Sequence, residues 1–263
     1  SGNKSDYTIT ETGYGQYTVV DNRTTSTWSA ADIATSADGV MDAHVADING
    51  DGYLDIVTAS MHDNTIAWYE NNKDRNPTFT KEDISTSAAS ANGIFVADLD
   101  GDGDLDIVSA SANDDKISWY EYYYGSFTER SIATSADQAS KVFVADLDGD
   151  GDLDIVSSSR GDDTIAWYEN DGADDPTFTA ADIATNADGA QDVHVADLDG
   201  DGDLDIVSAS ANDDKISWYE YYYGSFTERS IATSADQASK VFVADLDGDG
   251  DLDIVSSSRG DDT

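Results

Sequence analysis

A short acidic segment, written VADLDGDGDLDIV in its second copy, occurs five times along the chain of 263 residues. The first aspartate of the acidic loop falls at 47, 98, 146, 197 and 245, so the spacing alternates between 51 and 48 residues. Residues 96–164 and 195–263 are identical to one another. A period of about 50 residues is typical of repeat architectures, in which each repeat is one structural unit that packs against its neighbours.

Each repeat has the pattern of four short β-strands separated by turn residues. In the second repeat we expect strands at about 93–98, 105–111, 116–123 and 126–133. Along KISWYEY, bulky side chains alternate onto both faces of the strand, which indicates a sheet buried on both sides. Helical periodicity is absent, and the coils of a β-solenoid are usually shorter than about 50 residues. We therefore predict an all-β fold, a β-propeller of four-stranded blades.

The two ends of the chain complement one another. The fifth repeat lacks its two outer strands, and residues 15–35 align without gaps with residues 165–185, which are outer strands of the third repeat. We expect the N-terminal strands to complete the last blade, so that 14–263 form a single five-bladed domain without exposed sheet edges. The alternative is strand exchange between chains, which would build a head-to-tail filament. Residues 1–13 match nothing in the repeat and are expected to be a tail or a donated strand.

The acidic segments have the pattern of an oxygen-only metal loop. In loop 98–106, aspartates occupy positions 1, 3, 5, 7 and 9, and glycines at positions 4 and 6 let alternate side chains converge. The first loop has Asn at position 3 and Tyr at position 7, so position 7 is expected to bind through its backbone carbonyl. The candidate metal ligands are Asp47, Asn49, Asp51, Tyr53 and Asp55; Asp98, Asp100, Asp102, Asp104 and Asp106; Asp146, Asp148, Asp150, Asp152 and Asp154; Asp197, Asp199, Asp201, Asp203 and Asp205; and Asp245, Asp247, Asp249, Asp251 and Asp253.

Calcium fits these loops better than the alternatives. An EF-hand would carry a bidentate Glu at position 12 and continue into a helix, whereas position 12 in the second loop is Ser109 and a strand follows. Mg²⁺ keeps its waters and prefers fewer protein ligands. A metal-free acidic turn would hold four carboxylates together at a cost of several kcal/mol in a partly dry site, by an order-of-magnitude argument. We expect about five Ca²⁺ ions, one per repeat.

The loop VADLDGDGDLDIV resembles the calcium loop of FG-GAP/VCBS repeats, which form the blades of integrin α-subunit head propellers and of many microbial and algal surface proteins. The resemblance covers all five loops. It implies calcium between the first and second strands of each blade, bound by the positions named above. The chain lacks the Phe-Gly and Gly-Ala-Pro words that name the family, and family propellers commonly have seven blades, so a seven-bladed parent is the alternative to five.

The charge and composition of the chain limit the classes of partner that it can bind. Thirteen basic and 55 acidic residues give a formal net charge of −42, which would repel nucleic acid. There is no Cys, and no apolar run approaches the roughly 20 residues of a membrane span. Loops of this kind work where calcium is near millimolar, which favours an extracellular or cell-surface location. Asn3 and Asn22 lie in N-glycosylation sequons, so the chain is a glycoprotein if a eukaryote secretes it.

Three further features bear on function. No G-x-S-x-G, H-E-x-x-H or Cys–His arrangement occurs, so we expect no enzyme activity. His44 and His194 occupy a position held by Phe in other repeats and are expected to be packing residues. Three tyrosines in a row at 122–124, and again at 221–223, must leave some rings exposed, which suits sugar stacking or protein contact. We therefore expect a structural or adhesive module of a surface layer, matrix or filament, with a carbohydrate-binding propeller as the alternative.

Overall fold

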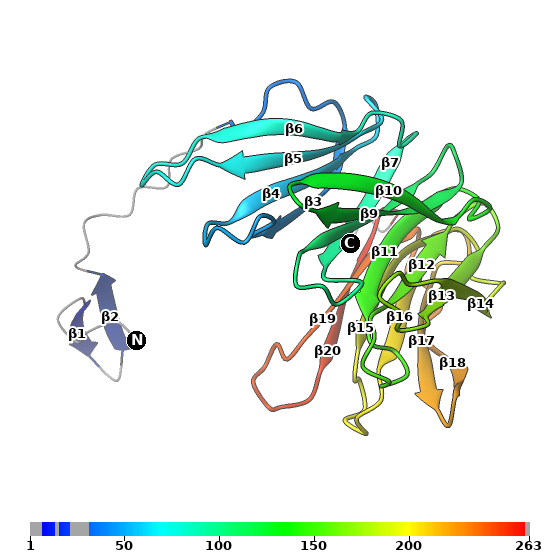
Figure 1. The fold of residues 1–263 in the computed structure, drawn as a ribbon. Coiled ribbons are helices and arrows are strands. Elements are labelled where there is room, and N and C mark those ends of the chain that lie inside the picture. Colours follow the sequence, from blue (N-terminus) through cyan, green and yellow to red (C-terminus); the bar gives the residue numbers. More distant parts are fainter. Residues whose placement is uncertain (1–6, 14–15, 22–31, 261–263) are drawn as a thin grey trace. The chain divides into compact units, whose positions relative to one another are not determined.

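The computed structural model describes residues 7–13, 16–21 and 32–260, and in these residues every regular element is a β-strand (Figure 1). The chain divides into two compact units, 1–35 and 36–263. In the first unit, β1 (Tyr7–Gly13) pairs with β2 (Gln16–Asp21) as an antiparallel hairpin. The boundary expected after residue 13 falls between these two paired strands, and the division into a tail and a single propeller domain stays a prediction. The sequons at Asn3 and Asn22, and residues 22–31 of the segment expected to complete the last blade, lie outside the described residues.

The second unit contains four four-stranded antiparallel sheets and one two-stranded sheet, in each of which neighbouring strands follow chain order. Valine, isoleucine and aromatic residues fill the strands because they suit a pleated, buried surface. The strands of the first two sheets are β3 (Val40–Ala46), β4 (Asp55–Ser60), β5 (Thr65–Asn71) and β6 (Phe79–Ser85), then β7 (Ala91–Ala97), β8 (Asp106–Ser111), β9 (Lys116–Tyr123) and β10 (Ser126–Ala133). The bounds of β7 to β10 confirm the strands expected in the second repeat to within two residues.

The remaining sheets repeat this plan. Strands β11 to β14 form the third sheet and β15 to β18 the fourth, whereas within the described part of the chain the fifth sheet contains only β19 and β20. Their bounds are β11 (Ala139–Ala145), β12 (Asp154–Ser159), β13 (Thr164–Asn170) and β14 (Phe178–Ala184); β15 (Ala190–Ala196), β16 (Asp205–Ser210), β17 (Lys215–Tyr222) and β18 (Ser225–Ala232); and β19 (Ala238–Ala244) and β20 (Asp253–Ser258).

The hydrophobic core is divided into four clusters, one between each pair of successive sheets. The cluster between the first and second sheets joins Val57 and Trp68 on one side to Ile94, Val96 and Tyr120 on the other. Both faces of an inner sheet are therefore buried, as the alternation along KISWYEY predicts. This face-to-face packing of repeated four-stranded sheets is the arrangement of propeller blades.

The first strands of the five sheets line a common cavity of about 380 Å³. Aromatic rings from successive sheets contact one another along it, with centroid separations of 4.8–5.2 Å, from His44 through Phe95, Phe143 and His194 to Phe242. The His44 ring also accepts a hydrogen bond at Nδ1 from the Val96 backbone (3.0 Å). Both histidines are thus packing residues, as expected, and burial lowers their pKa.

The outward faces of the first and last sheets are the exception to this burial. Leu246, in the acidic loop of the fifth sheet, is 61% exposed, whereas the identically placed Leu147 in the loop of the third sheet is 2% exposed. Val45 in the first sheet is 55% exposed, against 7% for its counterpart Val195. These side chains are exposed because no neighbouring sheet covers them among the described residues. The structure therefore shows neither the closure of the ring nor the expected count of five complete blades.

Candidate metal centres

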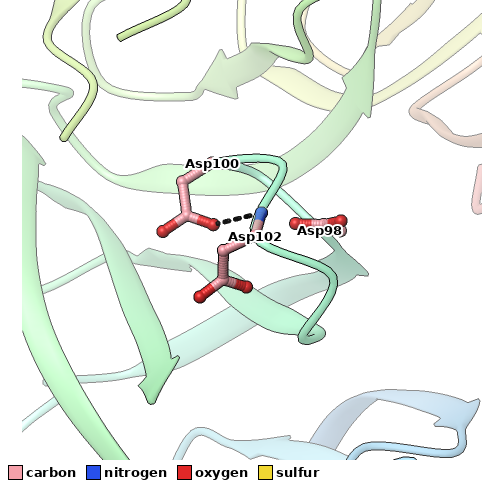
Figure 2. Close-up of side chains that lie close together, drawn as sticks. All are labelled: Asp98, Asp100 and Asp102. Atoms are coloured by element: carbon pink, nitrogen blue, oxygen red, sulfur yellow. Dashed lines mark hydrogen bonds between the residues drawn. The ribbon is translucent and has the colours of Figure 1, made fainter. Parts of the chain in front are cut away.

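Each acidic loop connects the first and second strands of its sheet. In loop 98–106 the backbone takes positive φ at Gly101 (72°) and Gly103 (97°), a conformation that favours glycine, and the chain turns back on itself. Backbone N–H groups inside the turn donate hydrogen bonds to the loop's own carboxylates: Asp102 N–H donates to Asp100 Oδ1 (3.2 Å), and Gly103 N–H donates to Asp98 Oδ2 (3.1 Å). Figure 2 shows the three aspartate side chains around this turn.

The loops bring the expected carboxylates together. In the second, third and fourth loops, positions 1, 3 and 5 each offer a carboxylate oxygen, and these oxygens lie within 4.8 Å of one another. In the fifth loop the group consists of positions 1, 3 and 9. The residues concerned are Asp98, Asp100 and Asp102; Asp146, Asp148 and Asp150; Asp197, Asp199 and Asp201; and Asp245, Asp247 and Asp253.

The donor set fits a hard divalent cation. Asp98 Oδ1 and Asp146 Oδ1 are buried and have no hydrogen-bond partner, although the other oxygen of each carboxylate accepts a backbone amide. A buried carboxylate oxygen without a partner is costly unless a cation satisfies it. Burial and then neighbouring carboxylates raise the pKa of Asp100 and Asp148. Carboxylate-rich, oxygen-only groups of this kind are what Ca²⁺ binds.

The aspartate at position 9 has a structural role that the sequence pattern does not reveal. Asp106 is almost fully buried; its Oδ1 accepts the Tyr122 N–H (2.8 Å) and its Oδ2 accepts the Leu99 N–H (3.2 Å). It therefore ties the loop to the third strand of the sheet. Burial raises the pKa of Asp106 to about 7 and that of its counterpart Asp154 to about 6. A ligand role for position 9 in these loops stays a prediction.

At position 7 the side chains of Asp104, Asp203 and Asp251 are exposed, as is that of Tyr53 in the first loop. None of these aspartates belongs to a carboxylate group among the described residues. Binding through the backbone carbonyl at position 7 is compatible with this placement and stays a prediction.

The first loop differs from the others. Its Asp47 accepts two backbone amides, from Asp51 (2.9 Å) and Gly52 (2.7 Å), as the first aspartates of the fourth and fifth loops also do, but its other positions have contacts of their own. Asn49 donates from Nδ2 to Glu70 Oε1 (3.1 Å). The Lys73 ammonium lies 2.9 Å from Asp51 Oδ2 and lowers the pKa of that carboxyl. Lys73 was not among the residues predicted from the sequence; the available signal was a lysine where the third repeat has Gly172.

The family model of the FG-GAP-like repeat matches the chain four times, at residues 47–109, 98–157, 146–208 and 205–256. These matches together cover well over half of the chain and run from one acidic loop through the next. The chain belongs to the FG-GAP-like repeat family. The absence of the Phe-Gly and Gly-Ala-Pro words therefore does not separate it from the family. No curated protein sequence matches the FG-GAP-like chain.

Solved structures support the propeller-like fold. A lectin from Agrocybe aegerita, described as specific for non-reducing terminal N-acetylglucosamine, has 22% identity and a TM-score of 0.55, with 82% of this chain and 60% of the lectin covered. The V. cholerae biofilm matrix protein Bap1 has 22% identity and a TM-score of 0.51, with 78% and 30% covered. A Desulfotomaculum acetoxidans protein of unknown function has 13% identity and a TM-score of 0.55, with 78% and 59% covered. The FG-GAP-like chain thus spans about 60% of the lectin's length, and at these identities the likeness concerns the fold alone.

Proposed function

We propose that this FG-GAP-like chain is a calcium-stabilised, non-enzymatic module of an extracellular adhesive or matrix protein. The observation that carries the proposal is the buried, unpartnered carboxylate oxygen of Asp98 and of Asp146, each inside a converging group of aspartates. A cation there would satisfy an oxygen that the fold leaves without a donor. Because a loop of this type joins the first two strands of every sheet, bound calcium would stabilise each sheet of the fold.

The extracellular, adhesive part of the proposal rests on the calcium concentration that loops of this class require and on the nature of two structural neighbours. Loops of this class fill where calcium is near millimolar, as it is outside cells. Two of the structural neighbours are a sugar-specific lectin and a biofilm matrix protein. No helix in the described residues is long and apolar enough to span a membrane.

Thermal unfolding with and without calcium tests the calcium part of the proposal. Identical melting curves in the two conditions would exclude calcium stabilisation.

We also propose that the free face of the fifth sheet packs on the free face of the first and closes a five-bladed ring within one chain. The segments 139–159 and 238–258, which contain β11–β12 and β19–β20, have identical sequences. β11–β12 pack against the fourth sheet, whose inner strand carries Asp192 and His194. The inner strand of the first sheet carries Asp42 and His44 at the same positions. A contact between the fifth and first sheets would therefore repeat one that the fold already makes.

Substitution of Val255 tests this closure. If the two faces meet, Val255→Asp places a carboxylate in an apolar interface and lowers the free energy of unfolding by more than about 2 kcal/mol. Val156→Asp, at the same position in the third sheet, is the matched control, because Val156 is fully buried. Urea unfolding of monomeric protein, verified by light scattering, gives both values. A Val255→Asp protein as stable as the parent would show that the face stays open, and concentration-dependent association lost in that variant would indicate exchange between chains.

Glycan binding is a second candidate function, favoured by two identical hairpin tips. Tyr124 and Tyr223 are each 88% exposed, and each contacts the preceding tyrosine edge to face at a centroid distance of 4.2 Å. Tyr124 has φ +49° and is followed by Gly125 at +82°, so a bulky ring occupies a two-residue turn where Asn or Gly is normal. Such a residue costs about 1 kcal/mol of local strain. Paired, exposed aromatic rings suit stacking on the apolar face of a sugar.

A glycan array that includes N-acetylglucosamine-terminated oligosaccharides tests this candidate. We expect the Tyr123→Ala/Tyr124→Ala variant to keep single-site binding and to lose about a hundredfold in avidity on a glycan-coated surface. The further loss of Tyr222 and Tyr223 abolishes binding. Tyr53→Ala, which removes an exposed tyrosine outside both tips, is the control. Binding that survives removal of both tips would assign the sugar site elsewhere.

A further inference from the structure

A positive charge from outside the first acidic loop already lies against one of its carboxylates. Its Lys73 ammonium lies 2.9 Å from Asp51 Oδ2, the carboxylate at loop position 5, whose side chain is only 14% exposed. Lys73 follows strand β5, 22 residues after Asp51 in the sequence, so the contact is made by the fold and not by the loop itself. Among the described residues, Lys73 with Asp51 is the only ion pair between a lysine or arginine and a ligand position of an acidic loop.

The first loop also carries less negative charge than the others. Both oxygens of Asp47 accept backbone amides, but so do both oxygens of the first aspartates of the fourth and fifth loops, so the difference lies at positions 3, 5 and 7. Asn49 replaces a carboxylate at position 3, and its amide donates to Glu70. The first loop therefore has three carboxylates, against five in each of the other loops, and one of the three already forms an ion pair with Lys73.

The equivalent position in the third repeat shows that the lysine is not required by the backbone. Gly172 corresponds to Lys73, and the two have nearly the same φ, +65° and +67°. Each donates its N–H to the asparagine two residues earlier, Asn170 or Asn71. Positive φ favours glycine and is strained for lysine. The first repeat thus keeps a charged side chain at a place where glycine makes the same turn without strain.

We infer that Lys73 acts as a built-in cation that takes the place of calcium in the first loop, so that this blade is held together without the metal while the other loops depend on it. The inference rests on the proposed calcium function. It predicts two classes of loop in one chain: a first loop that is ordered and weakly calcium-binding, and the remaining loops, which are strongly calcium-binding. The reason is electrostatic, since Ca²⁺ must displace an ammonium that already neutralises Asp51.

Calorimetric titration of the whole chain with Ca²⁺, after chelator treatment, tests the inference. We expect four strong sites and one that is about tenfold weaker. Lys73→Gly, which installs the residue of the third repeat, is expected to strengthen the weak site severalfold, because Asp51 is then free of its ion pair. Lys73→Arg retains the cation and keeps the weak site. Lys81→Ala changes the net charge equally but removes a lysine that pairs with Asp83 outside the loop, and it leaves the pattern unchanged.

Hydrogen exchange of the calcium-free protein provides a second readout. The amides of Asp51 and Gly52 are expected to stay protected in the parent and to lose protection in Lys73→Gly, whereas those of Asp102 and Gly103 exchange fast in both. Five equal calcium sites in the parent, or a weak site whose affinity is unchanged in Lys73→Gly, would overturn the inference and leave calcium binding intact. A chain that binds no calcium at any loop would overturn the proposed function as well.

Discussion

Chelation of calcium with EDTA is expected to lower the melting temperature of the protein by about 20 °C or more relative to 10 mM Ca²⁺. Extracellular calcium modules have dissociation constants of about 0.1 mM, so each filled loop adds about 2.7 kcal/mol at a hundredfold excess of the ion. Four strong loops then contribute about 11 kcal/mol, and about 2–4 °C is gained per kcal/mol in a domain of this size. Differential scanning calorimetry measures the shift, and added Ca²⁺ should restore the original curve.

The pH dependence of the chelated protein provides an internal check. Burial raises the pKa of Asp106 to about 7 and that of Asp154 to about 6, above the value near 4 in the unfolded chain. The folded state therefore binds more protons than the unfolded state, and stability falls as pH rises from about 4 to about 7. In EDTA the protein should melt lower at pH 8 than at pH 5.5. In calcium that difference should shrink, because the ion favours the ionised carboxylates. Curves that do not respond to calcium at either pH would refute the metal assignment.

Asp106→Ala is expected to destabilise the second sheet by about 3 kcal/mol or more, even without calcium. The substitution leaves the buried backbone N–H groups of Leu99 and Tyr122 without acceptors, and each unsatisfied group costs about 1–3 kcal/mol. Urea unfolding in EDTA at pH 5.5 isolates this structural part, because Asp106 is then protonated in the folded state and the metal is absent.

Asp104→Ala is the matched control in the same loop. The Asp104 side chain is exposed and accepts none of the hydrogen bonds found among the described residues, so its removal should change stability by less than about 0.5 kcal/mol. With calcium present it should also leave binding nearly unchanged if position 7 uses its backbone carbonyl. Equal losses in both variants would mean that Asp106 acts only through loop charge, and a harmless Asp106→Ala would remove its structural role.

Local patterns predicted the strands and the convergence of the acidic loops, because both features depend on residues that are close together in the sequence. Alternation along KISWYEY predicts a sheet buried on both sides, and Trp119 and Tyr120 are indeed fully buried on its two faces. The convergence of Asp98, Asp100 and Asp102 follows from the positive φ of Gly101 and Gly103 within a loop of nine residues. The family resemblance, confirmed over residues 47–256, rests on the same short sequence motifs.

Contacts between distant residues were not predictable in the same way. The pairing of Lys73 with Asp51 needs the tip after the third strand to fold over the loop before the second strand. The hydrogen bonds from Leu99 and Tyr122 to Asp106 need three strands in register. Residues 1–13 gave no repeat signal, yet β1 pairs with β2, because strand pairing depends on which partner is within reach and not on similarity to a repeat.

By itself the sequence determined the repeat, the four-stranded sheet and the acidic loop, since a period of about 50 residues and alternating side chains leave few ways to bury the apolar ones. Only the tertiary structure decided which copies are equivalent. Leu147 and Leu246 occupy identical sequences, but one is buried and the other exposed, because burial depends on whether a neighbouring sheet covers the residue. In the same way the fold decided that Lys73 contacts Asp51, because the two residues are 22 positions apart in the sequence and meet only when the end of β5 lies against the loop.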